Sequence, residues 1–347
     1  MHREIKQDSI VVRERPFRSL KRIWQGLYAA NTAASPYASY EFARILRRAY
    51  AFELFYGGFP RFFVFYKGGS PIMIAPLTLQ LGKTGWKYAG FGARFRLVSE
   101  EFIYGDSLSE DDMEVCLRLL LSRVGHINFK FLSDSGLLYK VLKLRFPFPE
   151  GGNEINVMLR LPATYDEYIA SLSRNRRNNI QKSVNHLKTD GLNYRFEIYR
   201  GADMPAGMYR RLLRLYSASY RCRWNSSQRW WRKALFPMRV KYMHPNAMAI
   251  NGIDESLCAV LFIDGKIAAM VGGYLQKNND YLLLPRLAFD ERFSRYSPGI
   301  ICLLETIRYL ISQGIPLLDL SKGDETYKFS LGGEAYWQYG FKASCGQ

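Results

Sequence analysis

The chain has 347 residues, of which 48% are hydrophobic and 15% aromatic, so it is long enough to build two domains with separate cores. This composition excludes a disordered or a fibrous protein. The formal net charge of +18 is typical of proteins that meet an anionic ligand, a nucleic acid or an anionic membrane surface.

Neither the N-terminus nor the cysteines suggest a secreted protein. The first residues are charged and lead into no apolar run of the kind that a signal peptide requires. No stretch reaches the roughly 18 uninterrupted apolar residues of a membrane-spanning helix. The five cysteines are scattered and form no CxxC pair, so we expect neither a disulfide framework nor a bound metal. The sequence therefore predicts a cytoplasmic protein.

The first half of the chain has the pattern of a short α/β unit. Two β-type runs flank a Gly-Gly turn over residues 63–75, which predicts a β-hairpin. Apolar residues at helical spacing over residues 109–123 predict a helix that ends at Gly125. We expect a strand to follow over residues 127–132.

The middle of the chain is basic and has the periodicity of helices. Apolar residues recur at helical spacing over residues 165–187 and 208–220, which predicts a mostly helical insertion over about 165–245. No acidic residue occurs between Asp203 and Asp254. The basic residues of that interval include Arg210, Arg211, Arg214, Arg221, Arg223, Arg229, Arg232, Lys233, Arg239 and Lys241.

The pattern of the first half returns after this insertion. Residues 259–270 form a second hairpin signal, around an Asp-Gly turn. A helical stripe over residues 297–313 ends at a glycine and leads into a strand over residues 317–320. The same order of elements thus occurs twice, which predicts a duplicated α/β unit with one domain over residues 1–150 and a second over residues 151–347.

The clearest local signal lies at the start of the second of these helices. Ser297 is a favoured N-cap residue, Pro298 is tolerated in the first turn, and Gly299 allows a ligand to approach the backbone. A helix N-terminus offers free N–H groups and partial positive charge, and both suit a phosphate group. Arg292 and Arg295 precede this turn and could add cationic contacts. For these residues alone, an ordinary helix cap is the alternative.

Four motifs, taken in order, resemble the acetyl-CoA-binding core of the GNAT superfamily. They are LSRNRRNNI at 172–180, IDGKIA at 263–268, SPG at 297–299 and DLSKGDETYK at 319–328. The chain is similar to the branch associated with cellulose and exopolysaccharide biosynthesis and to the related Fem-type aminoacyl transferases. This resemblance implies an α/β (α+β) fold of tandem GNAT-like domains, each a mixed, mostly antiparallel sheet flanked by helices.

The resemblance also implies an activity. The chain would be an acyl-CoA-dependent N- or O-acyltransferase, with acetyl-CoA as the first choice of co-substrate and without a metal. Its acceptor would be a sugar, an amino sugar or an amino-acid-like molecule in polysaccharide or envelope biosynthesis. Backbone N–H groups of a strand over residues 281–289 would hold the donor and polarise its carbonyl. The expected donor-binding residues are Leu287, Phe289, Arg292, Arg295, Ser297 and Gly299.

Transfer of this kind depends on positioning and on the removal of one proton from the acceptor. The candidates for this step follow the last motif strand and are Asp324, Tyr327 and Lys328. Asp324 is the first choice as proton acceptor, because Gly323 permits a tight turn that would aim its carboxylate at the site. Lys328 could instead stabilise developing negative charge. A solvated turn is the alternative for Asp324.

A small-molecule or glycan acceptor with negative charge would suit the basic middle segment. Arg174 and Arg177 belong to a basic run near the start of that segment, and Trp224 and Trp230 alternate with arginines. These four residues are expected to bind the acceptor by charge and by stacking. A solvated helix face is the alternative for the arginines, and core packing is the alternative for the tryptophans.

The first copy of the unit lacks the donor motif. Glu110, Asp111 and Asp112 stand where the second copy has its Pro-Gly pair, and their carboxylates would repel a pyrophosphate. We therefore expect the first domain to be a degenerate GNAT-like scaffold. The second domain is expected to carry the acyltransferase site.

Two other functions fit the charge. The first is aminoacyl transfer from a charged transfer RNA, as in the Fem-type proteins, although the sequence shows no long helical arm to hold that RNA. The second is a non-catalytic nucleic-acid-binding protein, because basic residues alternate with aromatic ones. A peripheral contact with an anionic membrane is compatible with the same charge.

Overall fold

The computed structural model describes residues 9–52, 58–82, 85–95, 97, 101–146, 150–222, 245–249, 252–278 and 280–345. The chain forms two compact units. Unit 1 consists of residues 1–154 together with residues 337–347, and unit 2 consists of residues 155–336.

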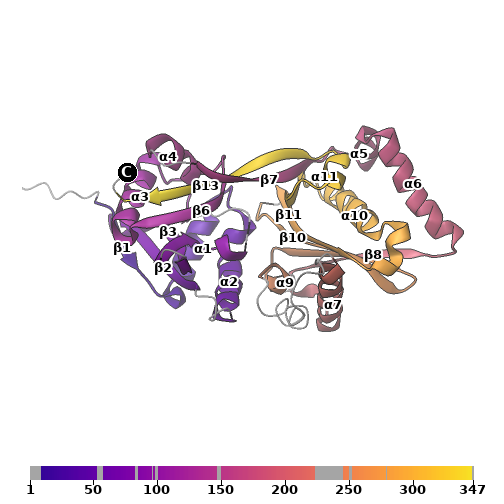
Figure 1. Ribbon diagram of the computed structural model, residues 1–347, viewed down its shortest axis with the longest axis horizontal. Coiled ribbons are helices and arrows are strands. Elements are labelled where there is room, and N and C mark those ends of the chain that lie inside the picture. Colours follow the sequence, from indigo (N-terminus) through magenta and orange to yellow (C-terminus); the bar gives the residue numbers. More distant parts are fainter. Residues whose placement is uncertain are drawn as a thin grey trace, which may run out of the picture. The chain divides into compact units, whose positions relative to one another are not determined.

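Unit 1 is a mixed, mostly antiparallel sheet with helices on both faces (Figure 1). Its strands lie in the order β1-β2-β3-β4-β6-β13, in which β4 and β6 run parallel, and the short β5 pairs with β3. The strands are β1 (Val11–Glu14), β2 (Gly58–Lys67), β3 (Ser70–Gly82), β4 (Gly85–Gly90), β5 (Ile103–Tyr104), β6 (His126–Ser133) and β13 (Glu334–Ser344). The helices are α1 (Lys21–Ala29), α2 (Tyr40–Phe52), α3 (Glu110–Val124) and α4 (Leu137–Arg145), with 3₁₀ turns η1 (Phe17–Ser19), η2 (Pro36–Ala38) and η4 (Ala93–Phe95).

The alternation of side chains along β2 lets one sheet pack against two layers of helices. Successive side chains of a strand point to opposite faces. Phe63 and Phe65 therefore join the core that α3 and α4 share. Phe62 lies on the other face, with its ring 5.2 Å from that of Phe17 and 6.0 Å from that of Trp24 on α1.

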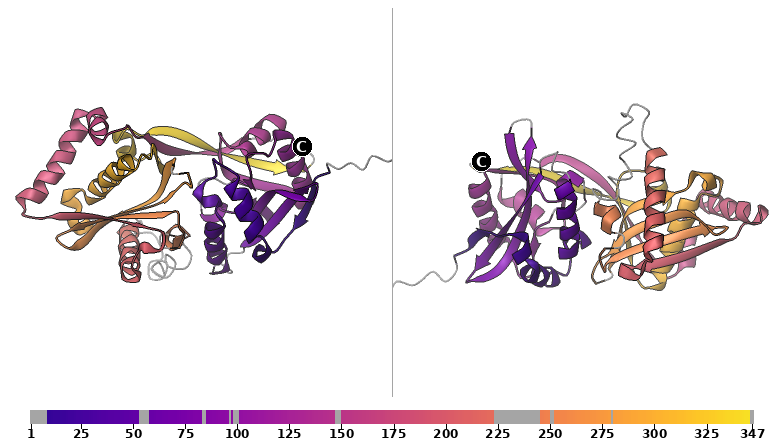
Figure 2. Two further views of the ribbon diagram at one scale, coloured as in Figure 1. Left: turned by 180° about the vertical axis from the view of Figure 1, so that it is seen from behind. Right: turned by 90° about the horizontal axis from the view of Figure 1, so that it is seen from below.

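Unit 2 has the same architecture (Figures 1 and 2). Its strands lie in the order β7-β12-β11-β10-β9-β8, in which β11 and β12 run parallel. The strands are β7 (Glu150–Arg160), β8 (Tyr194–Arg200), β9 (Ser256–Ile263), β10 (Lys266–Leu275), β11 (Tyr281–Phe289) and β12 (Leu317–Lys322). The helices are α5 (Tyr165–Ser171), α6 (Arg174–Thr189), α7 (Ala206–Cys222), α9 (Pro245–Ala249), α10 (Pro298–Ser312) and α11 (Thr326–Ser330), with 3₁₀ turns η5 (Gly201–Asp203) and η6 (Glu291–Tyr296).

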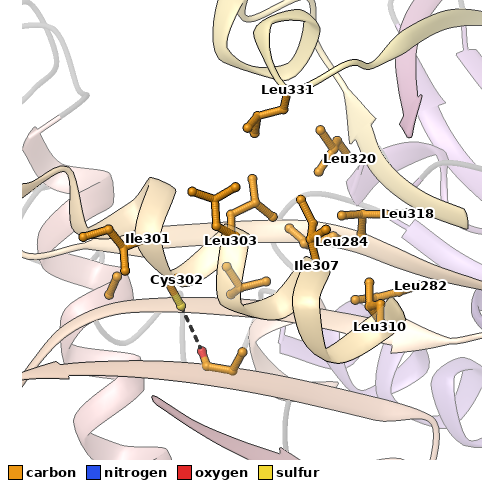
Figure 3. Packing of buried hydrophobic residues seen from close by; sticks show 14 of the residues in the cluster. Leu282, Leu284, Ile301, Cys302, Leu303, Ile307, Leu310, Leu318, Leu320 and Leu331 are labelled. Atoms are coloured by element: carbon orange, nitrogen blue, oxygen red, sulfur yellow. Dashed lines mark hydrogen bonds between the residues drawn. The ribbon is translucent and has the colours of Figure 1, made fainter. Parts of the chain in front are cut away.

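The two faces of the unit 2 sheet bury different cores. Along β9, Ala259 belongs to the core under α10, whereas its neighbours Cys258 and Val260 belong to the core under α7 and α9. Figure 3 shows the first core, in which leucines of β11 and β12 meet one face of α10. There the Cys302 thiol donates to the Ala259 carbonyl at 3.7 Å. Helices α5, α6 and α11 contribute side chains to the same core, so these helices lie on the α10 face.

The two units repeat one order of elements. Apart from short elements, unit 1 runs β1, α1, α2, β2, β3, β4, α3, β6, and unit 2 runs β8, α7, α9, β9, β10, β11, α10, β12. In both, three successive strands pair antiparallel, and the strand after the helix pairs parallel with the third. The predicted duplication and the predicted fold class are confirmed. So are the helix ends at Gly125 and Gly314, whose φ angles are 79° and 68°.

The segment expected to be a helical insertion, about 165–245, proves to be different. It contains the strand β8, and with α7 and α9 this strand repeats the β1, α1, α2 order of unit 1. Helical periodicity did not reveal β8 because it is an edge strand with largely half-exposed or exposed residues. Such a strand lacks the alternation that marks a half-buried one.

Each unit receives one strand from the other half of the chain. After α4 of unit 1, the chain continues through β7, which pairs with β12 of unit 2. After α11 of unit 2, the chain continues through β13, which pairs with β6 of unit 1. Residues 337–347 therefore belong to unit 1 and not to the second domain, to which the sequence analysis assigned them. The reason is that Phe341 and Ala343 fill the core of unit 1, where each is 1% exposed.

Candidate active site

The two parallel strands of unit 2 separate part-way along their length. β11 and β12 pair from Tyr281 and Leu317 as far as Leu283 and Asp319, although β11 continues to Phe289. Beyond Leu283, the described strand pairings give β11 no partner on its β12 side. An extended ligand could lie along this part of β11 in the place of β12, beside the Pro285 carbonyl, which accepts a hydrogen bond from Nη1 of Arg286 at 3.1 Å.

A β-bulge accompanies this separation. Leu284 and Pro285 of β11 stand opposite the single residue Gly273 of β10. Proline fits here because it donates no ladder hydrogen bond. A Cβ atom at Gly273 would lie 2.6 Å from the carbonyl oxygen of Leu283, so the bulge requires glycine on the facing strand. The extra residue also changes which side chains point to α10: Leu282 does so before the bulge, and Leu287 does so after it.

The N-terminal turn of α10 lies against the far part of β11. A Cβ atom at Gly299 would lie 3.0 Å from Cδ2 of Leu287 and 3.5 Å from Cδ1 of Phe289. Close packing of the helix on the strand therefore accounts for glycine at this position, in addition to any approach by a ligand. Leu287 and Phe289, expected to bind the donor, thus lie beneath this turn.

The cap of α10 differs from the expected one. Ser297 has left-handed backbone angles, with φ 50° and ψ 50°, and its side chain makes no capping hydrogen bond. A non-glycine residue in this region costs roughly 1–3 kcal/mol. The first turn contains no acidic residue, and the Gly299 N–H donates to no group within the part of the chain that the structure describes. The turn therefore fits a phosphate group, with an unused donor and no opposing charge.

The two arginines before this turn are held by carboxylates. Arg292 makes a two-point contact with Asp290, with Nη2 2.6 Å from Oδ2, and this guanidinium holds the pKa of Asp290 below its ordinary value. Arg295 lies 3.2 Å from Oδ2 of Asp190, which also accepts a hydrogen bond from Tyr296. Both arginine side chains are largely exposed, so each keeps N–H groups for a further anion.

A buried carboxylate, which the sequence analysis did not single out, lies where β11 and β12 separate. Asp319 is 5% exposed. Its Oδ1 accepts from the Ser321 N–H at 2.7 Å, and its Oδ2 accepts from the Tyr336 hydroxyl at 2.7 Å. Burial raises the pKa of Asp319 to about 6, although both hydrogen bonds and the charge of Lys328 oppose this shift. The signal in the sequence was a carboxylate within the apolar strand Leu317–Lys322.

The predicted catalytic residues occupy unlike environments. Asp324 is exposed in the turn before α11, and Tyr327 packs against the core under α10. Lys328 is 2% exposed. Its ammonium group donates to the carbonyls of Ser321, Lys322 and Gly323 at 3.2, 2.7 and 3.1 Å, and it lies 2.9 Å from a carboxylate oxygen of Glu325.

The predicted acceptor residues are only partly described. Trp224 and Trp230 lie outside the described residues. Arg174 is exposed in the first turn of α6. Arg177 donates to the carbonyls of Ala170, at 2.9 Å, and of Leu172, so it ties α6 to the end of α5.

The equivalent helix of unit 1 has a different N-terminus. The Ser109 hydroxyl caps α3 by accepting from the Asp112 N–H at 3.1 Å, and Glu110, Asp111 and Asp112 fill the first turn. Asp112 is paired with Lys67 at 3.0 Å. Negative charge thus occupies the place at which α10 of unit 2 is free of acidic residues.

Two further findings bear on the chemistry. Among the described residues, no three His, Cys, Asp or Glu side chains gather closely enough to hold a metal ion. Among the described helices, none is both long and apolar enough to cross a membrane.

Comparison with known proteins agrees with the geometry of unit 2. Residues 174–329 match the model of a family described as the acetyltransferase (GNAT) domain. Unit 2 is a GNAT acyltransferase domain. The GNAT match supports an acyltransferase over the alternative of a non-catalytic nucleic-acid-binding protein. No curated protein has a sequence that matches this chain.

Several solved structures share the fold of the whole chain. FemX has a TM-score of 0.63 at 9% identity, over 96% of this chain and 97% of that one. A conserved protein of unknown function from Bacteroides thetaiotaomicron VPI-5482 has a TM-score of 0.57 at 10% identity, over 97% and 100%. A tandem GNAT protein from the clavulanic acid biosynthesis pathway has a TM-score of 0.51 at 11% identity, over 98% and 99%. At these identities the likeness is one of fold, and it extends the tandem GNAT architecture to unit 1.

Proposed function

We propose that the chain is an acyl-CoA-dependent N- or O-acyltransferase, with acetyl-CoA as the first choice of donor. Its acceptor would be a sugar, an amino sugar or an amino-acid-like molecule in polysaccharide or envelope biosynthesis. The observation that supports this proposal most directly is the separation of β11 from β12 beside the acid-free N-terminus of α10. An extended arm can lie along β11 beyond its pairing with β12 while its pyrophosphate meets the helix N-terminus.

Residues of unit 2 would hold the donor as follows. The Gly299 N–H and the positive end of α10 would bind the pyrophosphate, and Arg292 and Arg295 would add the N–H groups that their carboxylate partners leave unused. Bound acyl-CoA would supply an activated thioester. The backbone of β11 beyond Leu283 would align the donor and polarise its carbonyl.

The residues that bind the acceptor and the residue that removes its proton are proposed from the sequence. Asp324 remains the proton acceptor that the sequence favours, with Tyr327 as the next candidate. Lys328 could stabilise developing charge only by giving up some of its bonds to carbonyl oxygens. Arg174, which is exposed, is proposed to attract an anionic acceptor together with Arg177, Trp224 and Trp230. A cytoplasmic location is proposed on the scattered cysteines alone.

The first experiment tests the donor site. The thermal stability of the protein is measured with acetyl-CoA, longer acyl-CoAs and nucleotide sugars, and acyl-CoA is expected to raise the melting temperature. Gly299→Val should abolish this shift, because its side chain would force the first turn of α10 away from Leu287 and from a phosphate at that turn. Ser312→Val adds the same side chain at the exposed end of the same helix and should keep the shift. Full acyl-CoA affinity in a folded Gly299→Val protein would contradict the proposed donor site.

Aminoacyl-tRNA remains the alternative donor, because FemX shares the fold. RNA binding that weakens steeply with salt, without any response to acyl-CoA, would favour this alternative. Binding to vesicles of anionic lipid is measured in parallel, since the net charge permits a peripheral membrane contact.

A further inference from the structure

Asp319 lies on the face of the sheet opposite α10. Its neighbours Leu318 and Leu320 both point into the core under α10, as Figure 3 shows. Because side chains alternate along a strand, Asp319 points the other way, toward the face that α7 and α9 cover. An acyl group held at the end of the β11–β12 pairing would therefore have α10 on one side and this carboxylate on the other.

The backbone bends to hold this carboxylate in place. Ser321 has a left-handed φ of 60°, and the pairing of β12 with β7 shifts register between Asp319 and Lys322. This bend turns the Ser321 N–H back onto Oδ1 of Asp319. Lys328 in turn donates to the carbonyls of Ser321, Lys322 and Gly323 at and after this bend. A strained residue and a buried ammonium group thus support the orientation of one carboxylate.

Tyr336 lies between this carboxylate and the surface. Its hydroxyl donates to Oδ2 of Asp319 at 2.7 Å, and its side chain is half-buried, whereas Asp319 is 5% exposed. The groups that act on the charge of Asp319 are Tyr336 from β13, the Ser321 N–H from β12 and Lys328 from α11. Lys328 is itself paired with Glu325. Tyr336 is therefore the group of this set through which a bound acceptor could reach the carboxylate.

We infer that Tyr336 and Asp319 act as a pair that removes the proton from the acceptor. This inference rests on the proposed function. In it, Tyr336 and Asp319 take the place of Asp324 as the groups that accept the proton. Tyr336 Oη takes the proton of the acceptor while its own proton passes to Oδ2 of Asp319. The lone pair of the acceptor nitrogen or oxygen forms the bond to the acyl carbon, and the carbon–sulfur bond breaks with its electrons on sulfur. The negative charge thus moves from Asp319 to the leaving thiolate, and solvent later removes the proton from Asp319.

The test combines titration of the ligand-free protein with turnover. The carboxyl carbons of aspartate are followed by ¹³C NMR from pH 4 to 9, and Asp319→Asn identifies the resonance of Asp319. Tyr336→Phe keeps the ring and removes only the hydrogen bond that favours the carboxylate. It should therefore raise the pKa of Asp319 above its wild-type value of about 6.

Turnover is measured as thiol release from acetyl-CoA, with D-glucosamine or water as the acceptor. Wild-type kcat should fall as the pH drops below about 6, and in Tyr336→Phe this fall should begin at a higher pH. Asp319→Asn should lower kcat by about 100- to 10,000-fold while acetyl-CoA affinity stays unchanged. The double variant should be little slower than Asp319→Asn, because the two residues act as one unit. Asp264→Asn, at a surface turn with a φ of 49° that asparagine tolerates, is the matched control and should behave as wild type.

The outcomes separate this inference from the proposed function. If acetyl-CoA neither binds nor is turned over by wild-type protein, the proposed function is wrong and the inference falls with it. If acetyl-CoA binds and is turned over, but Asp319→Asn reacts at the wild-type rate, the inference alone is wrong. The same conclusion follows if Asp324→Asn, and not Asp319→Asn, lowers kcat. It also follows if the fall of kcat at low pH begins at the same pH in Tyr336→Phe as in the wild type.

Discussion

Asp319 and Lys328 are both charged, both buried and close in space, yet they do different things. Lys328 directs its N–H donors at carbonyl oxygens at the end of β12 and just after it, and pairs with Glu325. Asp319 keeps a carboxylate whose ionised form burial disfavours. At the scale of single residues, the lysine therefore stabilises the backbone, and the aspartate is the group with a proton to exchange near neutral pH.

The ionisation of Asp319 should appear in the pH dependence of stability. Its pKa is raised from 3.8 to about 6, so between these values the folded state holds a proton that the unfolded state has released. The free energy of unfolding therefore falls as the pH rises through this window, by about 3 kcal/mol for a shift of about two pKa units. Asp319→Asn should remove this fall. Urea unfolding near pH 4 and near pH 7.5 checks it.

The comparison must be made against the wild type at each pH. Glu101 of unit 1, whose pKa burial raises to about 7, contributes a fall of the same sign in both proteins. Only the difference between the two proteins isolates Asp319. A difference that does not change with pH would show that Asp319 has an ordinary pKa.

Lys328→Met should destabilise the protein by about 2–4 kcal/mol, because it leaves buried carbonyl oxygens without their donor. Lys188→Met, at an exposed position of α6, is the control and should change the free energy of unfolding by less than about 0.5 kcal/mol. Denaturant unfolding measures both. Equal stability of the two variants would mean that the Lys328 bonds to the chain contribute nothing.

At the scale of elements, the β-bulge in β11 lies beside the proposed donor site. The residue added at Leu284–Pro285 interrupts the pairing with β10, which resumes at Arg286, and directly follows Leu283, the last residue paired with β12. Bulges bend a strand and increase its local twist. One irregularity thus lies where the two parallel strands separate, and Leu287, which follows it, lies against the N-terminus of α10.

Gly273→Ala should disturb this bulge. Its methyl group would lie 2.6 Å from the Leu283 carbonyl oxygen, and because that oxygen belongs to the backbone, the strands must move apart. We expect a loss of about 1–3 kcal/mol in the free energy of unfolding and weaker acyl-CoA binding.

Gly207→Ala is the control for this substitution. Gly207 lies in α7 with no atom near its Cβ position, so alanine should be neutral or stabilising by up to about 1 kcal/mol. If the free energy of unfolding of Gly273→Ala equals or exceeds that of the wild type, the strands accommodate the methyl group without strain.

At the scale of the whole molecule, the exchange of strands makes the halves of the chain depend on each other. β13, which follows the catalytic domain in sequence, fills the edge of the unit 1 sheet beside β6. β7, which follows unit 1, lies beside β12. Neither half of the sequence, cut near residue 150, contains a complete sheet of its own.

Phe341→Ala tests this dependence. Phe341 is 1% exposed in the core of unit 1, and its truncation should cost about 3–5 kcal/mol there. Hydrogen exchange should then accelerate in peptides of residues 9–146 more than in peptides of residues 256–322. Phe329→Ala, at a position that is 39% exposed in α11, is the control and should change neither. Faster exchange confined to unit 2 in Phe341→Ala would contradict the assignment of β13.

Local patterns in the sequence were sufficient for the repeated unit and for the N-terminus of α10. The hairpins, the helices that end at Gly125 and Gly314 and the strands after them depend on periodicity and on glycine at positive φ, which are properties of neighbouring residues. The Ser-Pro-Gly turn was visible for the same reason, although its serine caps the helix without a side-chain bond. These features would be expected in any chain that contains the same local patterns.

The tertiary structure decided the rest. Residues 337–347 were assigned to the wrong unit. The local sequence of a strand does not determine which of two similar sheets the strand joins. The special position of Asp319 depends on a hydroxyl 17 residues later in the chain and on a partner strand that stops pairing beside it. Burial, pairing register and hydrogen bonds between distant residues arise only when the chain has folded, so a single buried carboxylate in an apolar strand was the one trace of this site in the sequence.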